Sequence, residues 1–329
     1  MLISIIIPVY KGGADFAICI EALKILSPQP LEIIIVIDGC SDDSIDIAHT
    51  SRLSLFKIIK LNERSGAAKA RNIGANAATG EILFFIDADV LVPSDIISDI
   101  QKIFTGNIGI DAVIGSYNDT PLKPNFLSQY KNLFHHYVHQ NSSQQASTFW
   151  TGCGAIKRDV FTAAGGFNEQ YKGSSIEDIE LGYRLKSMGY NIRLEKSLQV
   201  THMKEWRPIS LIKSDLIDRA IPWTELSIRY KNNVNDLNLS YSSKISVVLV
   251  YLMILTFPIN ISVSSAFFII LISINLPIYR FYYQKRGLIF VLMTVPWHSL
   301  YYLYCGIGYV VGIIRYYYCL RQLVIPIRN

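Results

Sequence analysis

Charged residues are scarce in this chain, and their scarcity is uneven. Of its 329 residues, 17% are charged and 50% are hydrophobic, so the chain holds more apolar sequence than one soluble core needs. Charges almost vanish from Lys244 onward, whereas the preceding part has the composition of an ordinary soluble domain. We therefore predict a soluble domain over residues 1–232 and a membrane domain over residues 244–329.

Other absences narrow the class of protein. The formal net charge is only +5 and the basic residues are scattered, which argues against nucleic acid and favours an anionic membrane surface as partner. The run from Leu2 to Val9 is too short for a signal peptide and lacks a basic flank, so we expect a strand there. The cysteines are odd in number and lack metal-ligand spacing, as in proteins of a reducing compartment: Cys19, Cys40, Cys153, Cys305 and Cys319.

Short apolar runs alternate with helical segments at the start of the chain. Strands are expected at residues 2–8, 31–37, 55–60 and 82–86, and helices at 14–26, 44–48 and 65–78. This alternation predicts an α/β fold with a parallel, doubly wound sheet. Ligands bind such sheets at the carboxyl ends of the strands, where Asp38, Asp87 and Asp89 would lie.

Two carboxylates, Asp87 and Asp89, directly follow the last of these strands. They repel each other unless a cation lies between them, and oxygen ligands suit Mg²⁺ or Mn²⁺, which usually bridge to substrate phosphates. No glycine-rich dinucleotide fingerprint or P-loop follows any strand, which adds weight to a metal as the phosphate holder. The pattern predicts a divalent cation site for a nucleotide diphosphate, although Asp-x-Asp after a strand can also be only a solvated turn.

Several short motifs, taken in order, resemble the family 2 glycosyltransferases with the GT-A fold. They are Pro8-Val9-Tyr10, Asp38 in IVIDGCSDDS, GAAKARNIG from Gly66 to Gly74, Asp87-Ala88-Asp89, TGCGA from Thr151 to Ala155 with Arg158, GGFNE from Gly165 to Glu169, and Glu177-Asp178. Each motif is weak, but the ordered set is specific and covers roughly residues 1–205. The resemblance implies a Rossmann-like, mostly parallel GT-A catalytic domain that uses a nucleotide-diphosphate sugar, expected to be UDP-linked.

The resemblance also implies a donor site. Tyr10 would stack on the nucleobase, Asp38 would accept hydrogen bonds from base or ribose, and Asp87 would lie near the ribose or sugar. The full set of expected donor-binding residues is Pro8, Tyr10, Asp38, Lys69, Arg71, Asp87 and Trp150. The alternatives are that Tyr10 and Trp150 are core residues, that Asp38 forms a turn, and that Lys69 lies on a solvated helix face.

The metal and the catalytic base follow from the same resemblance. Asp89 matches the metal-contacting carboxylate, with Asp87 as a second candidate. His202 matches a histidine that lies near the metal, although a lone histidine more often binds a backbone group. Asp178 would be the base that takes the proton of the acceptor hydroxyl in an inverting displacement. Acidic residues also favour the first turn of a helix for electrostatic reasons alone, which would explain Glu177 and Glu180.

The second part of the chain is predicted from its apolar pattern. We expect a long helix over residues 118–145, an amphipathic helix over 208–231 in the membrane interface or closing the soluble core, and membrane helices at about 245–260, 262–279 and 288–314. The basic segment 280–286 should be cytoplasmic, as should the catalytic domain. For the last run we favour a re-entrant pair over a span, because Pro296, Gly306, Gly308 and Gly312 would permit a break.

The sequence therefore predicts a glycosyltransferase of the inner (plasma) membrane that adds one sugar to a hydroxyl of a lipid-linked glycan in cell-surface polysaccharide synthesis. A single addition is favoured because only Arg219 and Trp223 remain of the Gln-x-x-Arg-Trp motif of processive synthases. Expected partners are the donor, the acceptor, the membrane and other enzymes of polysaccharide biosynthesis. Two alternatives stay open: a polyprenyl-phosphate glycosyltransferase that needs no base, and a non-catalytic nucleotide-sugar-binding membrane scaffold.

Overall fold

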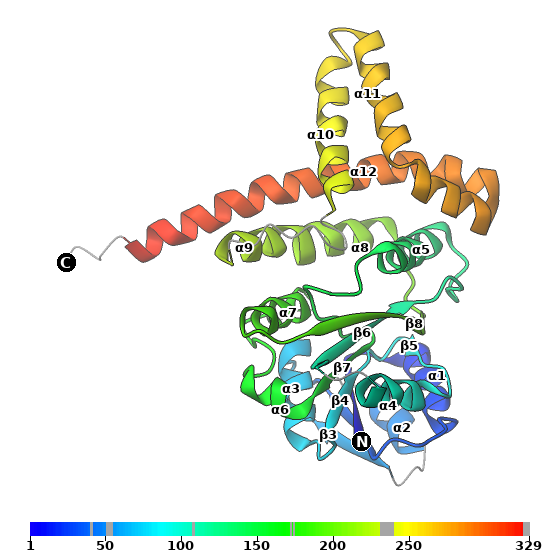
Figure 1. Ribbon diagram of the computed structural model, residues 1–329, viewed down its shortest axis with the longest axis vertical. Helices are drawn as coiled ribbons and strands as arrows, with labels where there is room; N and C mark the ends of the chain where they lie inside the picture. Colours follow the sequence, from blue (N-terminus) through cyan, green and yellow to red (C-terminus); the bar gives the residue numbers. More distant parts are fainter. Residues whose placement is uncertain are drawn as a thin grey trace. The chain divides into compact units, whose positions relative to one another are not determined.

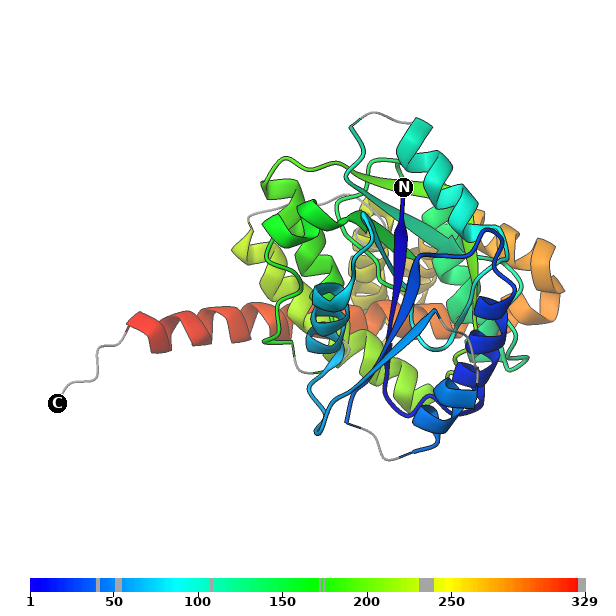
Figure 2. The ribbon, with the colours of Figure 1, turned by 90° about the horizontal axis from the view of Figure 1, so that it is seen from below.

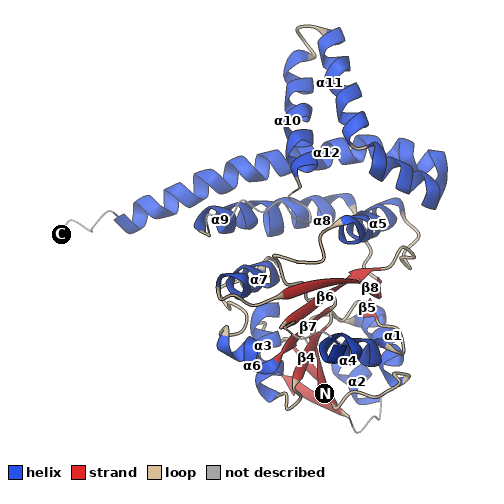
Figure 3. Ribbon diagram, viewed as in Figure 1, coloured by secondary structure: helices blue, strands red, loops and turns tan. Residues whose placement is uncertain are grey.

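The chain divides into two compact units, Met1–Glu205 (unit 1) and Trp206–Asn329 (unit 2). The computed structural model describes residues 1–39, 42–50, 55–106, 109–171, 173, 175–230 and 240–324, with side chains up to residue 318. Within these residues, every strand belongs to unit 1 and unit 2 is helical (Figures 1 and 3).

Unit 1 is built on one sheet of eight strands in the order β3-β2-β1-β4-β7-β6-β8-β5. The strands are β1 (Ile3–Val9), β2 (Glu32–Ile37), β3 (Phe56–Lys60), β4 (Ile82–Phe85), β5 (Val90–Leu91), β6 (Ala112–Tyr117), β7 (Gly154–Lys157) and β8 (Ile192–His202). Strands β1 to β4 pair in parallel, as do β6 and β8, whereas β7 is antiparallel to both β4 and β6. The mostly parallel α/β fold is confirmed, and the carboxyl ends of β1, β2, β4, β6 and β8 share one edge.

The central strands β1, β2, β4 and β6 are mostly apolar and buried, so helices cover both faces of the sheet there. Ile5 and Ile7 of β1 pack in the core cluster that includes Phe16 of α1 (Gly13–Lys24) and Ile97 of α4 (Ile96–Gly106). On the opposite face, a Cβ added at Gly74 of α3 (Ala67–Ala77) would lie 2.6 Å from the Ile6 side chain. Figure 2 shows α1 and α2 (Ser44–Thr50) on one side of the strands and α3 on the other. Small residues thus let α3 approach the sheet closely.

Three further helices complete unit 1: α5 (Phe126–Asn141), α6 (Arg158–Ala163) and α7 (Glu177–Ser187). Helix α5 is shorter than the predicted segment 118–145. Its histidines contact the backbone of β6: His136 Nδ1 lies 2.7 Å from the Tyr117 carbonyl oxygen, and His139 Nδ1 lies 3.0 Å from that of Gly115. These two imidazoles therefore fasten α5 to β6.

Unit 2 consists of helices. They are α8 (Pro208–Lys213), the π-helix η1 (Ser214–Ala220), α9 (Ile221–Arg229), α10 (Tyr241–Thr256), α11 (Ile261–Ile274) and α12 (Leu276–Val324). The predicted amphipathic helix 208–231 corresponds to α8, η1 and α9, with Pro222 accommodated in the first turn of α9. Because these helices pack on α12, the division between units falls before α8 instead of near residues 232–243.

The expected break in the last apolar run is wrong. The only non-helical residue inside α12 is Gly287 (φ 79°), and the helix continues through Pro296 to Val324. The later glycines instead allow helices to pack closely. A Cβ added at Gly306 would lie 2.4 Å from the Tyr251 ring. A Cβ added at Gly308 would lie 2.6 Å from Ala220 Cβ, and one added at Gly312 would lie 2.7 Å from Thr224 Cβ. One helix segment, Leu276–Tyr318, is long and apolar enough to cross a membrane. Helices α10 and α11 are shorter.

Candidate active site

Polar side chains gather where the parallel strands of unit 1 end. Tyr10 directly follows β1, Asp38 follows β2, Asp87 and Asp89 follow β4, and His202 is the last residue of β8. These strands run in the same direction, so their carboxyl ends bring the five residues to one edge of the sheet. Pro8 lies one residue before the end of β1, in register with Val36.

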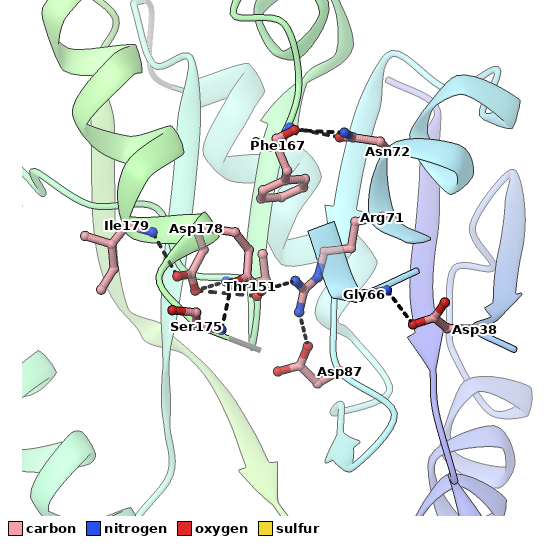
Figure 4. A network of polar contacts seen from close by, with 11 residues as sticks. Asp38, Gly66, Arg71, Asn72, Asp87, Thr151, Phe167, Ser175, Asp178 and Ile179 are labelled. Carbon is pink, nitrogen blue, oxygen red and sulfur yellow. Dashed lines mark hydrogen bonds and ion pairs between the residues drawn. The ribbon is translucent and has the colours of Figure 1, made fainter. Parts of the chain in front are cut away.

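Asp38 is buried, with 3% of its surface exposed, and is held by backbone groups. The N–H of Ser65 donates to Oδ1 at 2.6 Å and the N–H of Gly66 donates to Oδ2 at 2.9 Å (Figure 4). The carboxylate therefore fixes the loop that leads into α3. Each oxygen keeps a second lone pair, so Asp38 can still accept a hydrogen bond from a ligand.

Tyr10 is 40% exposed, and a cation lies over its ring. The guanidinium carbon of Arg64 lies 4.2 Å from the ring centroid, in cation–π geometry. The loop carrying Arg64 can approach because Gly39 (φ 63°) has no Cβ, which would lie 2.2 Å from the Arg64 backbone nitrogen. Arg64 is a candidate nucleobase contact that the sequence motifs do not single out.

Arg71 connects the two halves of the site, and it is buried at 4% exposure. Its Nη2 donates to Asp87 Oδ1 at 2.7 Å and its Nη1 donates to Glu177 Oε1 at 2.8 Å (Figure 4). Burial alone would lower the pKa of this guanidinium, but Asp87 and Glu177, followed by Asp178, raise it above its usual value. Arg71 therefore acts as an ion-pair bridge, and its expected part in donor binding stays a prediction. Lys69, the other basic residue expected to bind the donor, is exposed on α3.

Asp89 and His202 form the pair expected to hold a metal. Asp89 Oδ2 lies 3.6 Å from His202 Nε2, and Val90 pairs with His202 across β5 and β8. Burial alone would raise the pKa of Asp89, but His202 and then Lys204 lower it below its usual value. Tyr117 stacks on the imidazole at a centroid distance of 4.5 Å, which fixes the ring plane.

This donor set fits a hard divalent cation. An ionised carboxylate and an imidazole supply two ligands, and Mg²⁺ or Mn²⁺ commonly takes its others from water and substrate phosphates. Among the described residues, no group of three or more His, Cys, Asp or Glu side chains could hold a metal by itself. The site would therefore be completed by the substrate.

Asp178 lies in the first turn of α7, beside the segment that precedes β7. Its Oδ2 is 3.3 Å from the backbone nitrogen of Thr151, and its Oδ1 accepts from the Ile179 N–H at 2.8 Å (Figure 4). The neighbouring Glu177 is anchored by Arg71 and by the Ser175 N–H, which donates at 2.9 Å. Asp178 is thus held at a fixed position next to a buried ion pair.

Trp150 is half-buried in an aromatic group with Tyr117 and His139. Its ring makes edge contacts with these two side chains at centroid distances of 4.7 and 5.1 Å. Gly152 is required next to it, since a Cβ there would lie 2.5 Å from the indole. The indole therefore packs against Tyr117, the residue that stacks on His202, and part of it stays accessible.

Asn72 joins two of the sequence motifs directly. Its Nδ2 donates to the Phe167 carbonyl at 2.8 Å, and its Oδ1 accepts from the Phe167 N–H at 2.8 Å (Figure 4). A Cβ at Gly166 (φ 69°) would lie 2.7 Å from that Oδ1, which explains the glycine. This amide-to-backbone pair holds α3 against the loop that follows α6.

The fold and this acidic edge define an α/β protein with a polar site at the carboxyl ends of its strands, and comparisons with known proteins give the family. Residues 4–164 match the sequence profile described as glycosyl transferase family 2, and residues 132–207 match the N-terminal domain of galactosyltransferase. Residues 4–164 of the chain therefore belong to glycosyl transferase family 2.

Curated relatives support this assignment over parts of their length. The chain is 41% identical over 88 residues to the uncharacterized glycosyltransferase YibD of Escherichia coli (strain K12), which covers 26% of each protein. It is 30% identical over 118 residues to glycosyltransferase GlyG of Streptococcus pneumoniae serotype 4, which covers 35% of this chain and 39% of that protein. The chain thus spans about a quarter to two fifths of the length of these relatives.

Solved structures share the GT-A fold. Mannosyltransferase PcManGT from Pyrobaculum calidifontis, in complex with GDP-Man and Mn²⁺, has a TM-score of 0.58 at 16% identity over 94% of this chain and 86% of that one. TarS of S. aureus, in complex with UDP-GlcNAc, has a TM-score of 0.54 at 16% identity over 79% of this chain and 74% of that one.

Proposed function

We propose that this protein is a metal-dependent, inverting glycosyltransferase that moves one sugar from a nucleotide-diphosphate donor to a hydroxyl of a membrane-held glycan. The observation that carries the proposal is the Arg71 bridge, which ties the Asp87 end of the donor motif to Glu177, the residue next to the proposed base Asp178. One guanidinium thus contacts a donor-site residue and the neighbour of the proposed base, which suits a displacement that needs donor and base together.

The donor is proposed to lie along the strand ends. Tyr10 and Arg64 offer a stacking surface for the nucleobase, and Asp38 offers free lone pairs for base N–H or ribose hydroxyl groups. Asp87, which is 34% exposed, keeps one carboxylate oxygen for the ribose or sugar while the other accepts from Arg71. We expect a UDP-linked sugar. The two structural neighbours bind UDP-GlcNAc and GDP-Man, so donors with either base belong in the test.

Asp89 and His202 would hold Mn²⁺ or Mg²⁺, with the diphosphate as the remaining ligand. When bound, the ion would neutralise negative charge on the departing nucleotide diphosphate. The chain's own contribution is to bring the Asp89 carboxylate and the His202 imidazole within 3.6 Å of each other and to fix the imidazole plane through Tyr117. Structural neighbours solved with Mn²⁺ and a nucleotide or nucleotide sugar support this proposal.

Asp178 would act as general base. The acceptor hydroxyl oxygen forms a bond to the anomeric carbon, its proton passes to an Asp178 carboxylate oxygen, and the bond from that carbon to the diphosphate breaks. The anchored Glu177 and the Thr151 contact keep the carboxylate from turning away. Attack from the face opposite the leaving group inverts the anomeric configuration.

A membrane-held acceptor is proposed because the long apolar helix α12 and the shorter apolar helices α10 and α11 follow the catalytic unit in the same chain. We place the enzyme at the inner (plasma) membrane with its catalytic unit in the cytoplasm, where other enzymes of polysaccharide biosynthesis would be neighbours. A lipid-linked glycan is the acceptor class that fits such a site.

The test is metal-dependent donor turnover by the purified full chain. Thermal unfolding is measured with UDP-glucose, UDP-GlcNAc, UDP-galactose and GDP-mannose, each with Mn²⁺ or EDTA, and the stabilising donor is then assayed for nucleotide release. Asp178→Asn should lower turnover by about 10²–10⁴-fold and leave donor stabilisation unchanged. Full turnover by this variant would favour a polyprenyl phosphate acceptor, and stabilisation without any turnover would favour a non-catalytic scaffold.

A further inference from the structure

Helices α10 and α11 form a hairpin, and its length is short for a membrane-crossing pair. They contain 16 and 14 residues, which at a rise of 1.5 Å per residue gives about 24 and 21 Å. The hydrocarbon core of a bilayer is about 30 Å thick and needs about 20 apolar residues per helix. The spans predicted at 245–260 and 262–279 are therefore shorter in the structure than a full crossing requires.

The hairpin has no charged residue from Ile245 to Tyr279. The nearest basic residues lie at its open end, with Lys244 in the first turn of α10 and Arg280 in the second turn of α12. The tip is instead apolar and exposed: Phe257 is 63% exposed, Ile259 83% and Ile261 65%. A tip that emerged into water on the far side of a membrane would be stabilised there by polar or charged residues. This tip has no charged residue.

Polar groups at the tip are satisfied within the hairpin. The Asn260 side-chain oxygen accepts from the Ser262 and Val263 N–H groups at 3.0 and 3.2 Å, and Pro258 has no N–H to satisfy. The N–H groups of Ile259 and Asn260 donate to the Thr256 carbonyl at 3.0 and 2.8 Å. The bilayer interior demands such internal pairing, because it supplies no water to exposed backbone groups.

Polar contacts close the open end of the hairpin and join it to α12. Asn275 Nδ2 donates to Ser246 Oγ at 2.9 Å, Tyr302 Oη donates to Asn275 Oδ1 at 2.7 Å, and Tyr251 Oη donates to the Leu303 carbonyl at 2.9 Å. Figure 1 shows α12 running across this end of the hairpin instead of alongside it.

The other half of α12 contacts helices that carry charges. Tyr304 Oη donates to Asp215 of η1 at 2.9 Å, and Arg315 Nε lies 3.0 Å from Glu225 of α9. A helix paired with these carboxylates would have to draw them into hydrocarbon if it crossed the bilayer, which costs several kcal/mol per charge. Although α12 is long enough to span, this half suits the membrane interface.

From these observations we infer that unit 2 is a monotopic anchor: the hairpin α10–α11 enters the lipid bilayer from one side and its tip stays in the hydrocarbon, while α12 lies along the interface. Lipid acyl chains contact the exposed surface of the hairpin. The inference extends the proposed membrane location, and it does not depend on the transfer reaction, so the two can fail separately.

The test is cysteine accessibility in the full chain in membrane vesicles of both orientations. Ile259→Cys reports the tip and Ser242→Cys the open end, and Ile25→Cys, 68% exposed in unit 1, is the positive control. The unmodified chain is labelled in parallel to subtract its own five cysteines. A membrane-impermeant maleimide should label Ser242→Cys from one side, and Ile259→Cys from neither side until detergent is added.

Two results would overturn the inference directly: labelling of Ile259→Cys from the side opposite to Ser242→Cys, which means a full crossing, or from the same side, which means no insertion. A protein partner that covers the tip would also protect Ile259→Cys from labelling. To distinguish this case from insertion into lipid, a bimane fluorophore is attached to Ile259→Cys of the purified chain in liposomes. Lipids with a quencher deep in the acyl chain should lower its emission at least twofold, and lack of quenching would refute a lipid-embedded tip.

Discussion

Replacing Arg71 by alanine is the most informative perturbation of the catalytic unit. The substitution removes the cation between Asp87 and Glu177. It leaves Glu177, which is 3% exposed, as a buried carboxylate whose remaining contact among the described residues is with the Ser175 N–H. Asp87 is 34% exposed and can be solvated, so the penalty should come mainly from Glu177.

The expected loss is about 3–5 kcal/mol of unfolding free energy, the range found when one partner of a buried ion pair is removed. For a domain of this size it corresponds to a fall in melting temperature of roughly 6–20 °C. Lys69→Ala, on the exposed side of the same helix, should change the free energy by about 0.5 kcal/mol or less. Arg71→Met combined with Glu177→Gln should recover part of the loss, because the buried charge is then gone.

The assay must report on unit 1 alone. Cys19 and Cys153 are fully buried in it, so their thiols react with a maleimide only when this unit unfolds. Pulse labelling across a urea series, with the two peptides quantified by mass spectrometry, gives the midpoint for each variant. A loss below about 1 kcal/mol for Arg71→Ala, or no recovery in the double variant, would refute the bridge as a stabilising element.

Three further perturbations test other parts of the molecule. Asp89→Asn should abolish the rise in melting temperature produced by Mn²⁺ with UDP, and an unchanged rise would contradict the metal assignment. Burial lowers the pKa of His139 from 6.5 to about 4, against the opposing hydrogen bond to the Gly115 carbonyl, so its neutral form stabilises the fold fully above pH 6.5 and less as pH falls toward 4. His139→Gln should reduce the change of the urea midpoint with pH over that interval. An unchanged slope of midpoint against pH would exclude His139 as the cause of this dependence. Gly308→Ala should destabilise unit 2 by about 1–3 kcal/mol in thermal unfolding, whereas Gly106→Ala, whose added Cβ meets nothing within 4 Å, should cost nothing measurable.

The first half of the sheet could be predicted from the sequence because its strands are short, apolar and separated by amphipathic helices. The expected bounds of β1 to β4 agree with the structure to within about one residue at each end. Strands β6 and β7 were not predicted, since they are defined by pairing with residues far along the chain, such as Phe84 with Ala155. Local pattern carries no information about such partners.

The site shows the same limit. Carboxylates at strand ends could be located because topology alone brings Asp38, Asp87 and Asp89 to one edge. The partners of these groups could not, because Arg64 and Glu177 reach the site through loop and helix positions that only tertiary packing determines. The roles proposed for Asp178, His202 and the donor-binding residues remain predictions for the experiments above.

The last strand of unit 1 connects the Asp89–His202 pair to unit 2. His202 ends β8, the Met203 N–H donates to the Asp89 carbonyl at 2.8 Å, and unit 2 begins at Trp206. The polypeptide thus leaves unit 1 next to the Asp89–His202 pair that is proposed to hold the metal. Under the proposed anchoring, a load applied to unit 2 reaches His202 along the backbone before it reaches the other strands of unit 1.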